Sequence, residues 1–229
     1  MKKLWNSFKV FVYSYTVQMI MMIVGIIIFF SLSGIDMLGI TDADIYKYMV
    51  IGSCISMIPV AIFLYKKYRI KEKNIDIKKL ILMIPLGLGV SLFYNMLTIN
   101  IQTPQVYDMN KYLVYFYVVL MAPIFEEIVF RYVTYNRLKE NYSKRNSILL
   151  ASLVFALMHS GIINIIYAFL IGVLFCYVYD RYKNILYPIL VHISANLMSV
   201  FITGFHWIAL IISFIDLLLL FLYFRKESH

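Results

Sequence analysis

Two adjacent glutamates stand inside an otherwise apolar stretch of the chain. Glu126 and Glu127 follow Pro123 closely, and Arg131 comes four residues after the second glutamate. In a helix this spacing puts Glu127 and Arg131 on one face, where the guanidinium can pair with the carboxylate. Glu126 points about 100° away around the helix axis. The spacing therefore predicts that Arg131 braces Glu127, while Glu126 faces a different cavity and is available for chemistry.

Two later apolar runs also contain polar side chains at helical spacing. His159 ends one run, while His192 and Asn196 are four residues apart in another and share a helix face. A single histidine in such a run is more often a hydrogen-bonded packing residue than a catalyst. The glutamate pair alone could be an ordinary charged helix end. Polar groups from three helices at membrane depth, however, favour a common functional site, because each one costs free energy unless it faces a wet or polar interior.

These residue types suit hydrolysis by an activated water molecule. A carboxylate in apolar surroundings can act as a general base, and a neutral imidazole can hold the same water and pass on its proton. A second histidine and an asparagine amide can donate hydrogen bonds to a developing oxyanion. A zinc ion held by Glu126, His159 and His192 is the alternative. No HExxH helix is present to make zinc specific, so no cofactor is favoured.

The composition indicates that membrane helices position these residues. Of the 229 residues, 62% are hydrophobic and 14% are charged, and the mean hydropathy is +0.81. We expect an all-α polytopic helical bundle that forms a single membrane domain over residues 1–229, with the catalytic core in residues 112–200. A spanning helix needs roughly 20 apolar residues. Eight candidate spans are predicted, at about 8–32, 48–65, 80–97, 112–130, 146–158, 162–179, 185–203 and 205–224.

The basic residues support this topology. With the first segment inside, 19 of the 21 Lys and Arg residues fall on the inner side of the eight spans, as the positive-inside rule expects. Both termini are therefore predicted to be cytoplasmic. The net charge of +9 sits in short clusters between apolar runs rather than on one face, which argues against nucleic acid as a partner and for membrane lipids with anionic headgroups.

The motif order resembles a known family. Three motifs follow one another on successive predicted membrane helices: Glu126-Glu127-xxx-Arg131, Phe155-xxx-His159 and His192-xxx-Asn196. Their order is similar to that of the CAAX protease and bacteriocin-processing (CPBP or Abi) family. Type II CAAX prenyl endopeptidases belong to that family, whose names still carry the word metalloprotease. The resemblance implies that Glu126 activates water with help from His159, and that Glu127 and Arg131 support Glu126. It also implies that His192 and Asn196 form the oxyanion site and that Phe155 packs beside His159.

The expected function is that of an intramembrane endopeptidase in the cell membrane that cleaves near the cytoplasmic face. Its substrate would be a membrane-associated peptide or a lipidated protein, with CAAX-type processing and bacteriocin or pheromone precursor processing both open. The alternative is a non-catalytic immunity or scaffold protein that binds a hydrophobic peptide. A proton-coupled transporter is a third reading, but the inverted repeats expected there are absent from the sequence.

Overall fold

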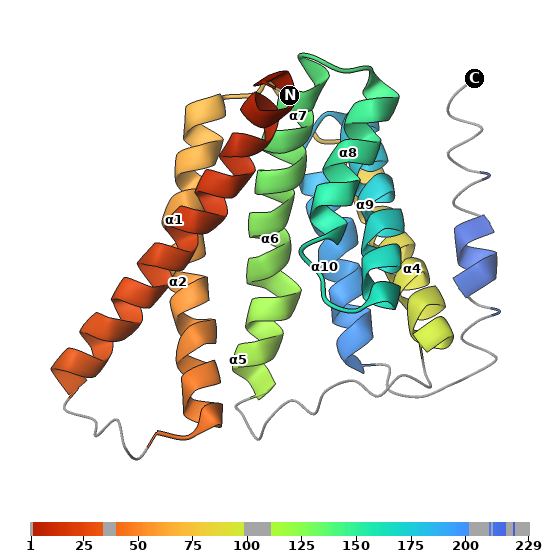
Figure 1. The fold of residues 1–229 in the computed structure, drawn as a ribbon. Coiled ribbons are helices and arrows are strands. Elements are labelled where there is room, and N and C mark those ends of the chain that lie inside the picture. The colour runs from red at the N-terminus through yellow and green to blue at the C-terminus, as the bar shows by residue number, and fades with distance from the viewer. Residues whose placement is uncertain are drawn as a thin grey trace. The chain divides into compact units, whose positions relative to one another are not determined.

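The computed structural model describes residues 2–33, 40–98, 111–201, 211, 213–218 and 222. Within these ranges every regular element is a helix (Figure 1), which confirms the predicted all-α class. The chain forms two compact units. The first contains Met1–Ile70 and Pro104–Asn141, and the second contains Lys71–Thr103 and Tyr142–His229.

The first unit begins with a helical hairpin. The helices α1 (Lys2–Ser33) and α2 (Asp42–Tyr68) run side by side, drawn in red and orange in Figure 1. Thr41 starts α2 through a capping box with Asp44, which satisfies amide groups that have no partner within the helix. Deeper in the hairpin, the Gln18 amide donates a buried hydrogen bond of 3.0 Å to Ser56 Oγ. A polar bond of this kind ties α1 to α2.

The rest of the first unit is one continuous helical rod of changing pitch. It consists of α5 (Lys111–Tyr115), the π-helix η2 (Phe116–Met121), α6 (Ala122–Glu127), the π-helix η3 (Ile128–Tyr135) and α7 (Asn136–Lys139). Pro123 has no amide hydrogen to donate, so the helical ladder is interrupted near the start of α6. All eight side chains of η3 are buried. π-helical turns are rare in proteins, and those that occur are often at functional sites. The widened helix next to Glu127 therefore indicates a candidate functional region.

The second unit packs α4 (Met83–Thr98) against α10 (Leu186–Phe201), and α8 (Lys144–Ala156) against α9 (Ile162–Tyr182). Gly87 lets the first pair approach closely: a Cβ atom at this position would overlap the carbonyl oxygen of Val191. Gly161 precedes α9 with φ of 85°, a conformation that glycine adopts without steric cost.

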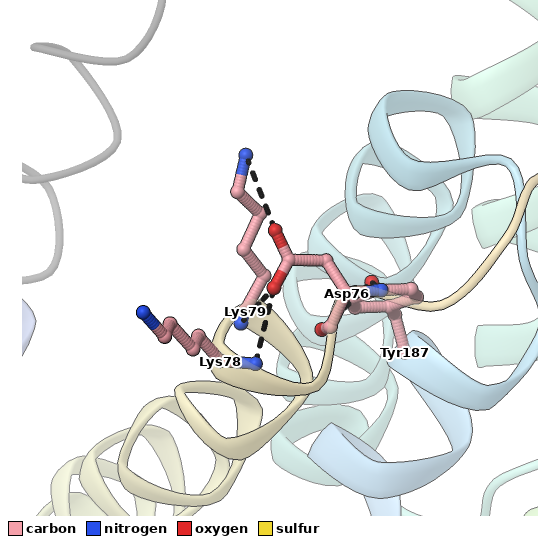
Figure 2. Close-up of polar contacts among 4 residues, drawn as sticks. All are labelled: Asp76, Lys78, Lys79 and Tyr187. Carbon is pink, nitrogen blue, oxygen red and sulfur yellow. Dashed lines mark hydrogen bonds and ion pairs between the residues drawn. The ribbon is translucent and has the colours of Figure 1, made fainter.

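A polar turn starts the short helix α3 (Ile77–Ile81) of the second unit. Asp76 Oδ1 accepts hydrogen bonds from the backbone amides of Lys78 and Lys79, at 3.1 and 3.3 Å (Figure 2). The amide of Asp76 itself donates to the Tyr187 hydroxyl at 2.9 Å. Tyr187 is buried and comes from the first turn of α10. This contact ties the start of α3 to α10, 111 residues further along the chain.

Five helices in the described part of the chain are long and apolar enough to cross a membrane, by length and composition: Leu4–Leu32, Asp42–Tyr68, Ile77–Asn95, Lys111–Lys139 and Ile162–Tyr182. They coincide with five of the predicted spans. The predicted span at 146–158 overlaps α8, which has 13 residues, and the described part of the predicted span at 185–203 contains the 16 residues of α10. A straight crossing needs roughly 20 residues. The predicted span at 205–224 lies mostly outside the described residues. The count of eight spans, the cytoplasmic termini and the single domain stay predictions.

Candidate functional site

The glutamate pair belongs to the first unit, where Glu127 ends α6 and Arg131 lies one turn later in η3. Arg131 Nη1 donates a hydrogen bond of 2.8 Å to Glu127 Oε1, and both side chains are fully buried, with 0% of their surface exposed. The predicted pairing of these two residues is therefore confirmed. A charge-assisted bond of this kind is strong, and burial makes both partners dependent on it.

Aromatic side chains of α1 hold the helix that carries the glutamates. The Tyr15 ring packs edge-on against Phe125 with 5.4 Å between ring centroids, and Phe11 lies 5.3 Å from Phe130. Such pairs add directional packing energy to their burial. Phe125 and Phe130 stand just before and just after the glutamate pair. The position of α6 and η3 is thus fixed by packing on both sides of the candidate catalytic carboxylates.

Glu126 differs from its neighbour in exposure, since it is half-buried while Glu127 is buried. The phenol groups of Tyr15 and Tyr117 lie within electrostatic range of Glu126. Sequence reasoning missed both tyrosines, because the chain contains 20 tyrosines and neither stands at a distinctive spacing from Glu126. A phenol hydroxyl can donate a hydrogen bond to a carboxylate, so these two residues are candidates for orienting Glu126.

An apolar groove of about 390 Å³ lies in the first unit. Its walls come from α2 and from the rod that carries Glu126. The lining residues are Met57, Ile58, Ala61, Ile62, Tyr65, Lys66, Met121, Ile124, Phe125 and Ile128. Two of them, Ile124 and Phe125, immediately precede Glu126 in the chain. Glu126 itself is absent from the lining, because its side chain points about 100° away from Phe125 around the helix axis.

The histidines and Asn196 belong to the second unit and line one cavity of about 250 Å³. Its walls come from α4, α9, α10 and the turn after α8, and its residues are Ser91, Tyr94, Phe155, His159, Asn164, Tyr167, Ala168, Ile171, His192, Ala195, Asn196 and Ser199. His192 and Asn196 face the same cavity from α10, as the four-residue spacing predicts. His192 is buried, and Asn196 is half-buried.

The hydrogen bonding of His159 indicates which ring nitrogen is available. Nδ1 lies 3.1 Å from the carbonyl oxygen of Phe155. A carbonyl oxygen can only accept, so we assign the ring hydrogen to Nδ1. In the neutral imidazole, Nε2 then carries a lone pair and can accept a hydrogen bond or a proton. This tautomer is the one that holding or deprotonating a water molecule requires.

Aromatic packing orients both imidazoles. The Phe155 ring meets His159 edge-on at 4.9 Å and His192 at 6.0 Å, so it contacts both histidines. The expectation that Phe155 packs beside His159 is confirmed. On its other side, His192 lies 4.7 Å from the Phe175 ring at an interplanar angle of 30°. The His192 ring therefore contacts two phenylalanine rings, which restricts its rotation.

Three further cavity residues were missed as site residues. The Tyr94 hydroxyl donates to Asn164 Oδ1, and its ring stacks on Tyr167 with 3.8 Å between centroids. Tyr94 comes from α4, whereas Asn164 and Tyr167 come from α9, so these contacts close one side of the cavity. No local spacing in the sequence connects Asn164 with His159.

The six predicted site residues are divided between the two units. Glu126, Glu127 and Arg131 belong to the first, and His159, His192 and Asn196 belong to the second. The structure builds one polar centre in each unit, and the convergence of the two centres on one substrate stays a prediction. In the part of the chain that the structure describes, no three His, Cys, Asp or Glu side chains within either unit could hold a metal ion. The zinc set draws on both units and stays the alternative.

The fold and its two polar centres define a helical membrane protein with candidate catalytic residues on its helices. Residues 108–198 match the family model of the type II CAAX prenyl endopeptidase, Rce1-like. This segment includes all six candidate residues and Phe155, and the match agrees with the resemblance that the motif order indicates.

One curated relative is also similar to part of the chain. A stretch of 77 residues is 30% identical to a Bacillus subtilis (strain 168) protein named "Putative membrane peptidase YdiL". The aligned stretch covers 34% of this chain and 32% of the relative, so the chain spans about a third of the length of this protein. No solved structure matches the chain. The family match, in contrast, is located on residues 108–198, which carry the glutamates and histidines.

Proposed function

We propose that this protein is a CAAX-type intramembrane endopeptidase in the cell membrane, which hydrolyses a peptide bond of a membrane-associated peptide or lipidated protein. The observation that carries the proposal is the location of Glu126, His159, His192 and Asn196 at two polar centres within one family-matched segment. Polar side chains at membrane depth cost free energy, so their presence there favours a functional role.

Glu126 is the proposed general base. It takes a proton from a water molecule while the water oxygen bonds to the scissile carbonyl carbon, and His159 Nε2 holds the same water. The C–N bond then breaks, and the departing amine receives the proton that Glu126 took up. The half-buried position of Glu126 supports this role, because the carboxylate can reach substrate while the surrounding helix shields it from bulk water.

His192 and Asn196 are the proposed oxyanion site. The asparagine amide has two N–H donors, and a ring N–H of His192 supplies another. Charge develops on the former carbonyl oxygen as water attacks, and fixed donors in a water-poor site stabilise that charge without reorganising. The packing of the His192 ring against Phe175 and Phe155 supports this role, since it keeps the imidazole in one orientation.

The apolar groove between α2 and the rod that carries Glu126 can hold a hydrophobic side chain or lipid group of a membrane-associated substrate. The ion pair between Glu127 and Arg131 has a supporting role. Arg131 balances the charge of the Glu127 carboxylate, and the pair fixes the helix turn from which Glu126 projects. The positively charged inner side expected from the sequence would also attract the anionic lipid surface on which such substrates lie.

The test is peptide cleavage by the purified protein in lipid. Three forms of the protein are compared: wild type, Glu126→Gln and Glu140→Gln. Glu140→Gln is the control, because it removes the same charge from an exposed position at the end of the same helical rod. Two substrates are compared: a fluorogenic peptide with a prenylated CAAX end and the same peptide without the lipid. We expect Glu126→Gln to lose roughly 10²- to 10⁴-fold in rate and Glu140→Gln to keep its rate.

Each remaining outcome assigns a different function. Loss of wild-type cleavage with a chelator would favour the zinc alternative. Peptide binding without cleavage, unchanged by Glu126→Gln, would favour the scaffold or immunity function. Cleavage of the lipid-free peptide at the same rate would assign an ordinary hydrophobic peptide as substrate rather than a lipidated protein. Full cleavage by Glu126→Gln would contradict the proposed mechanism.

A further inference from the structure

The hairpin of α1 and α2 contains a second apolar groove, outside the candidate site of the first unit. It has a volume of about 480 Å³, in the range of ligand-binding pockets. Its lining residues are Lys9, Val10, Tyr13, Ser14, Val17, Met21, Pro59, Val60, Phe63, Leu64, Lys67 and Tyr68. Several of its apolar side chains are accessible to a ligand, since Tyr13 and Phe63 are each 58% exposed and Val17 is 47% exposed. We call this the hairpin groove.

The antiparallel register of the hairpin brings two lysines to one end of this groove. Gln18 of α1 bonds with Ser56 of α2, and Met22 accepts a hydrogen bond from Ser53. A step of four residues toward the start of α1 thus corresponds to about three residues toward the end of α2. The register continues to Lys9, which lines the same groove as Lys67.

The two lysines make this end of the groove cationic. In the described parts of the chain, neither Lys9 nor Lys67 forms an ion pair with a carboxylate. The Lys67 ammonium lies over the Phe63 ring, 5.1 Å from its centroid, which keeps it at the groove. Glu140, which lies within electrostatic range of the groove residue Tyr68, pairs with Arg137 at 3.6 Å. The charge at this end is therefore left to be balanced by a ligand.

The apolar part of the groove has the length of one membrane leaflet. From Lys9 to Met21 the helix α1 rises about 18 Å, at about 1.5 Å per residue. Half of the hydrocarbon core of a bilayer is about 15 Å thick. A lipid tail that lies along Val10, Val17 and Met21 would therefore extend from the lysines to roughly the middle of the membrane.

We propose that the hairpin groove binds one anionic phospholipid, with its phosphate at Lys9 and Lys67 and an acyl chain along the apolar wall. Cationic charge at one end and an apolar wall of leaflet length match the two halves of such a lipid. This proposal does not rest on the endopeptidase function. A lipid held there would fill the open side of the hairpin and support the α1 aromatic side chains that pack on Phe125 and Phe130.

A neighbouring groove on the same hairpin serves as an internal comparison. It has a volume of about 410 Å³ and is lined by apolar residues of α1 and α2, with Lys47 at its end. Lys47 lies within electrostatic range of Asp44. One lysine with a carboxylate nearby gives this groove little net charge, so we expect no preference for anionic over neutral lipids there.

The test measures lipid retention by the purified protein in a neutral detergent, using native mass spectrometry. Dioleoyl-phosphatidylglycerol is titrated against the wild type, with dioleoyl-phosphatidylcholine as the neutral lipid of the same chain length. The variants are Lys9→Gln/Lys67→Gln and a matched control, Lys71→Gln/Lys78→Gln, which removes the same charge from exposed positions in the second unit. A third variant, Val17→Trp, narrows the apolar wall.

We expect Lys9→Gln/Lys67→Gln to weaken phosphatidylglycerol binding about 30-fold, the loss expected for two lysines near an anionic headgroup. The control should change it less than twofold, and phosphatidylcholine binding should be unaffected by either pair. Val17→Trp should weaken both lipids. If both double variants lost the same amount of phosphatidylglycerol affinity, only the total charge of the protein would matter. If the wild type bound both lipids equally tightly, no headgroup would be recognised. Either result would overturn the proposal.

Discussion

The guanidinium of Arg131 lies 2.8 Å from Oε1 of Glu127, and neither side chain has exposed surface. Both residues gave up their hydration on folding, which costs several kcal/mol for each ion unless the partner is present. The pair also spans the junction of α6 and η3, where the helix changes its pitch. Its position next to Glu126 means that any distortion of this turn would move the proposed base.

Arg131→Met should therefore be strongly destabilising. The substitution leaves the Glu127 carboxylate buried without its guanidinium, and breaking a buried pair in this way costs roughly 3–5 kcal/mol. We expect the unfolding midpoint of the detergent-solubilised protein to fall clearly, and peptide cleavage to fall with it. Denaturant unfolding followed by circular dichroism measures the first effect, and the fluorogenic peptide measures the second.

The double variant Glu127→Gln/Arg131→Met separates the two effects. It removes both charges, so most of the stability lost in the single variant should return. Cleavage should stay low, because the turn that positions Glu126 no longer has its ion pair. A double variant as unstable as Arg131→Met would show that lost packing, rather than the unpaired charge, causes the destabilisation.

His159→Asn should reduce cleavage without unfolding the second unit. The asparagine amide can still donate to the carbonyl of Phe155, as Nδ1 does at 3.1 Å, but it offers no acceptor at the position of Nε2. We expect a loss in kcat of roughly 10²- to 10⁴-fold with an unchanged unfolding midpoint. His159→Ala is the comparison, since it removes both functions and should lower stability as well. Normal turnover by His159→Asn would exclude Nε2 from the reaction.

The sequence predicts the helices and the local pairs well, because both depend on short-range rules. The length of apolar runs locates the spans, and the four-residue spacing places Glu127 beside Arg131 and His192 beside Asn196 on one face. The widened pitch of η2 and η3 was not predicted. The eight residues of η3 are all buried and none of η2 is, so the two segments share no burial pattern, and apolar periodicity does not distinguish a π-helix from an α-helix over so few residues.

Contacts between helices distant in sequence were the main omission. Tyr94 and Tyr167 stack at 3.8 Å, yet they are two of 20 tyrosines in the chain, and most aromatic residues of a membrane protein belong to core packing or interfacial belts. Tyr15 and Tyr117 near Glu126 were missed for the same reason. Their roles depend on which helices become neighbours, and spacing along one helix carries no such information.

Two glycines predict opposite stability changes for the same substitution. A methyl group at Gly87 would overlap Val191 O and lie 2.7 Å from Ser194 Cβ, whereas nothing lies within 4 Å of a methyl group at Gly25. Gly87→Ala should destabilise by about 1–3 kcal/mol, because α4 must move away from α10. Gly25→Ala should stabilise by up to about 1 kcal/mol through helix propensity. Unfolding midpoints of both variants test this, and equal shifts would contradict the close approach of α4 and α10.

The hydrogen bond from Tyr94 to Asn164 predicts a change in substrate binding rather than in chemistry. Tyr94→Phe keeps the ring stacked on Tyr167 but removes the hydroxyl that links α4 to α9. Asn164 is exposed, so the loss of stability should stay below about 1.5 kcal/mol. Because the hydroxyl closes one side of the histidine cavity, KM for the peptide should rise several-fold while kcat changes less than twofold.

The matched control for this prediction is Tyr177→Phe, which removes a hydroxyl that accepts a hydrogen bond from Arg181 at 3.4 Å. Tyr177 is on α9, like Asn164, but is absent from the lining of the histidine cavity. Both kinetic constants of this variant should match those of the wild type. An interaction made only in the transition state affects turnover and leaves ground-state binding unchanged. A fall in kcat at unchanged KM for Tyr94→Phe would therefore contradict the prediction and place the Tyr94 hydroxyl among the groups that act on the reacting atoms.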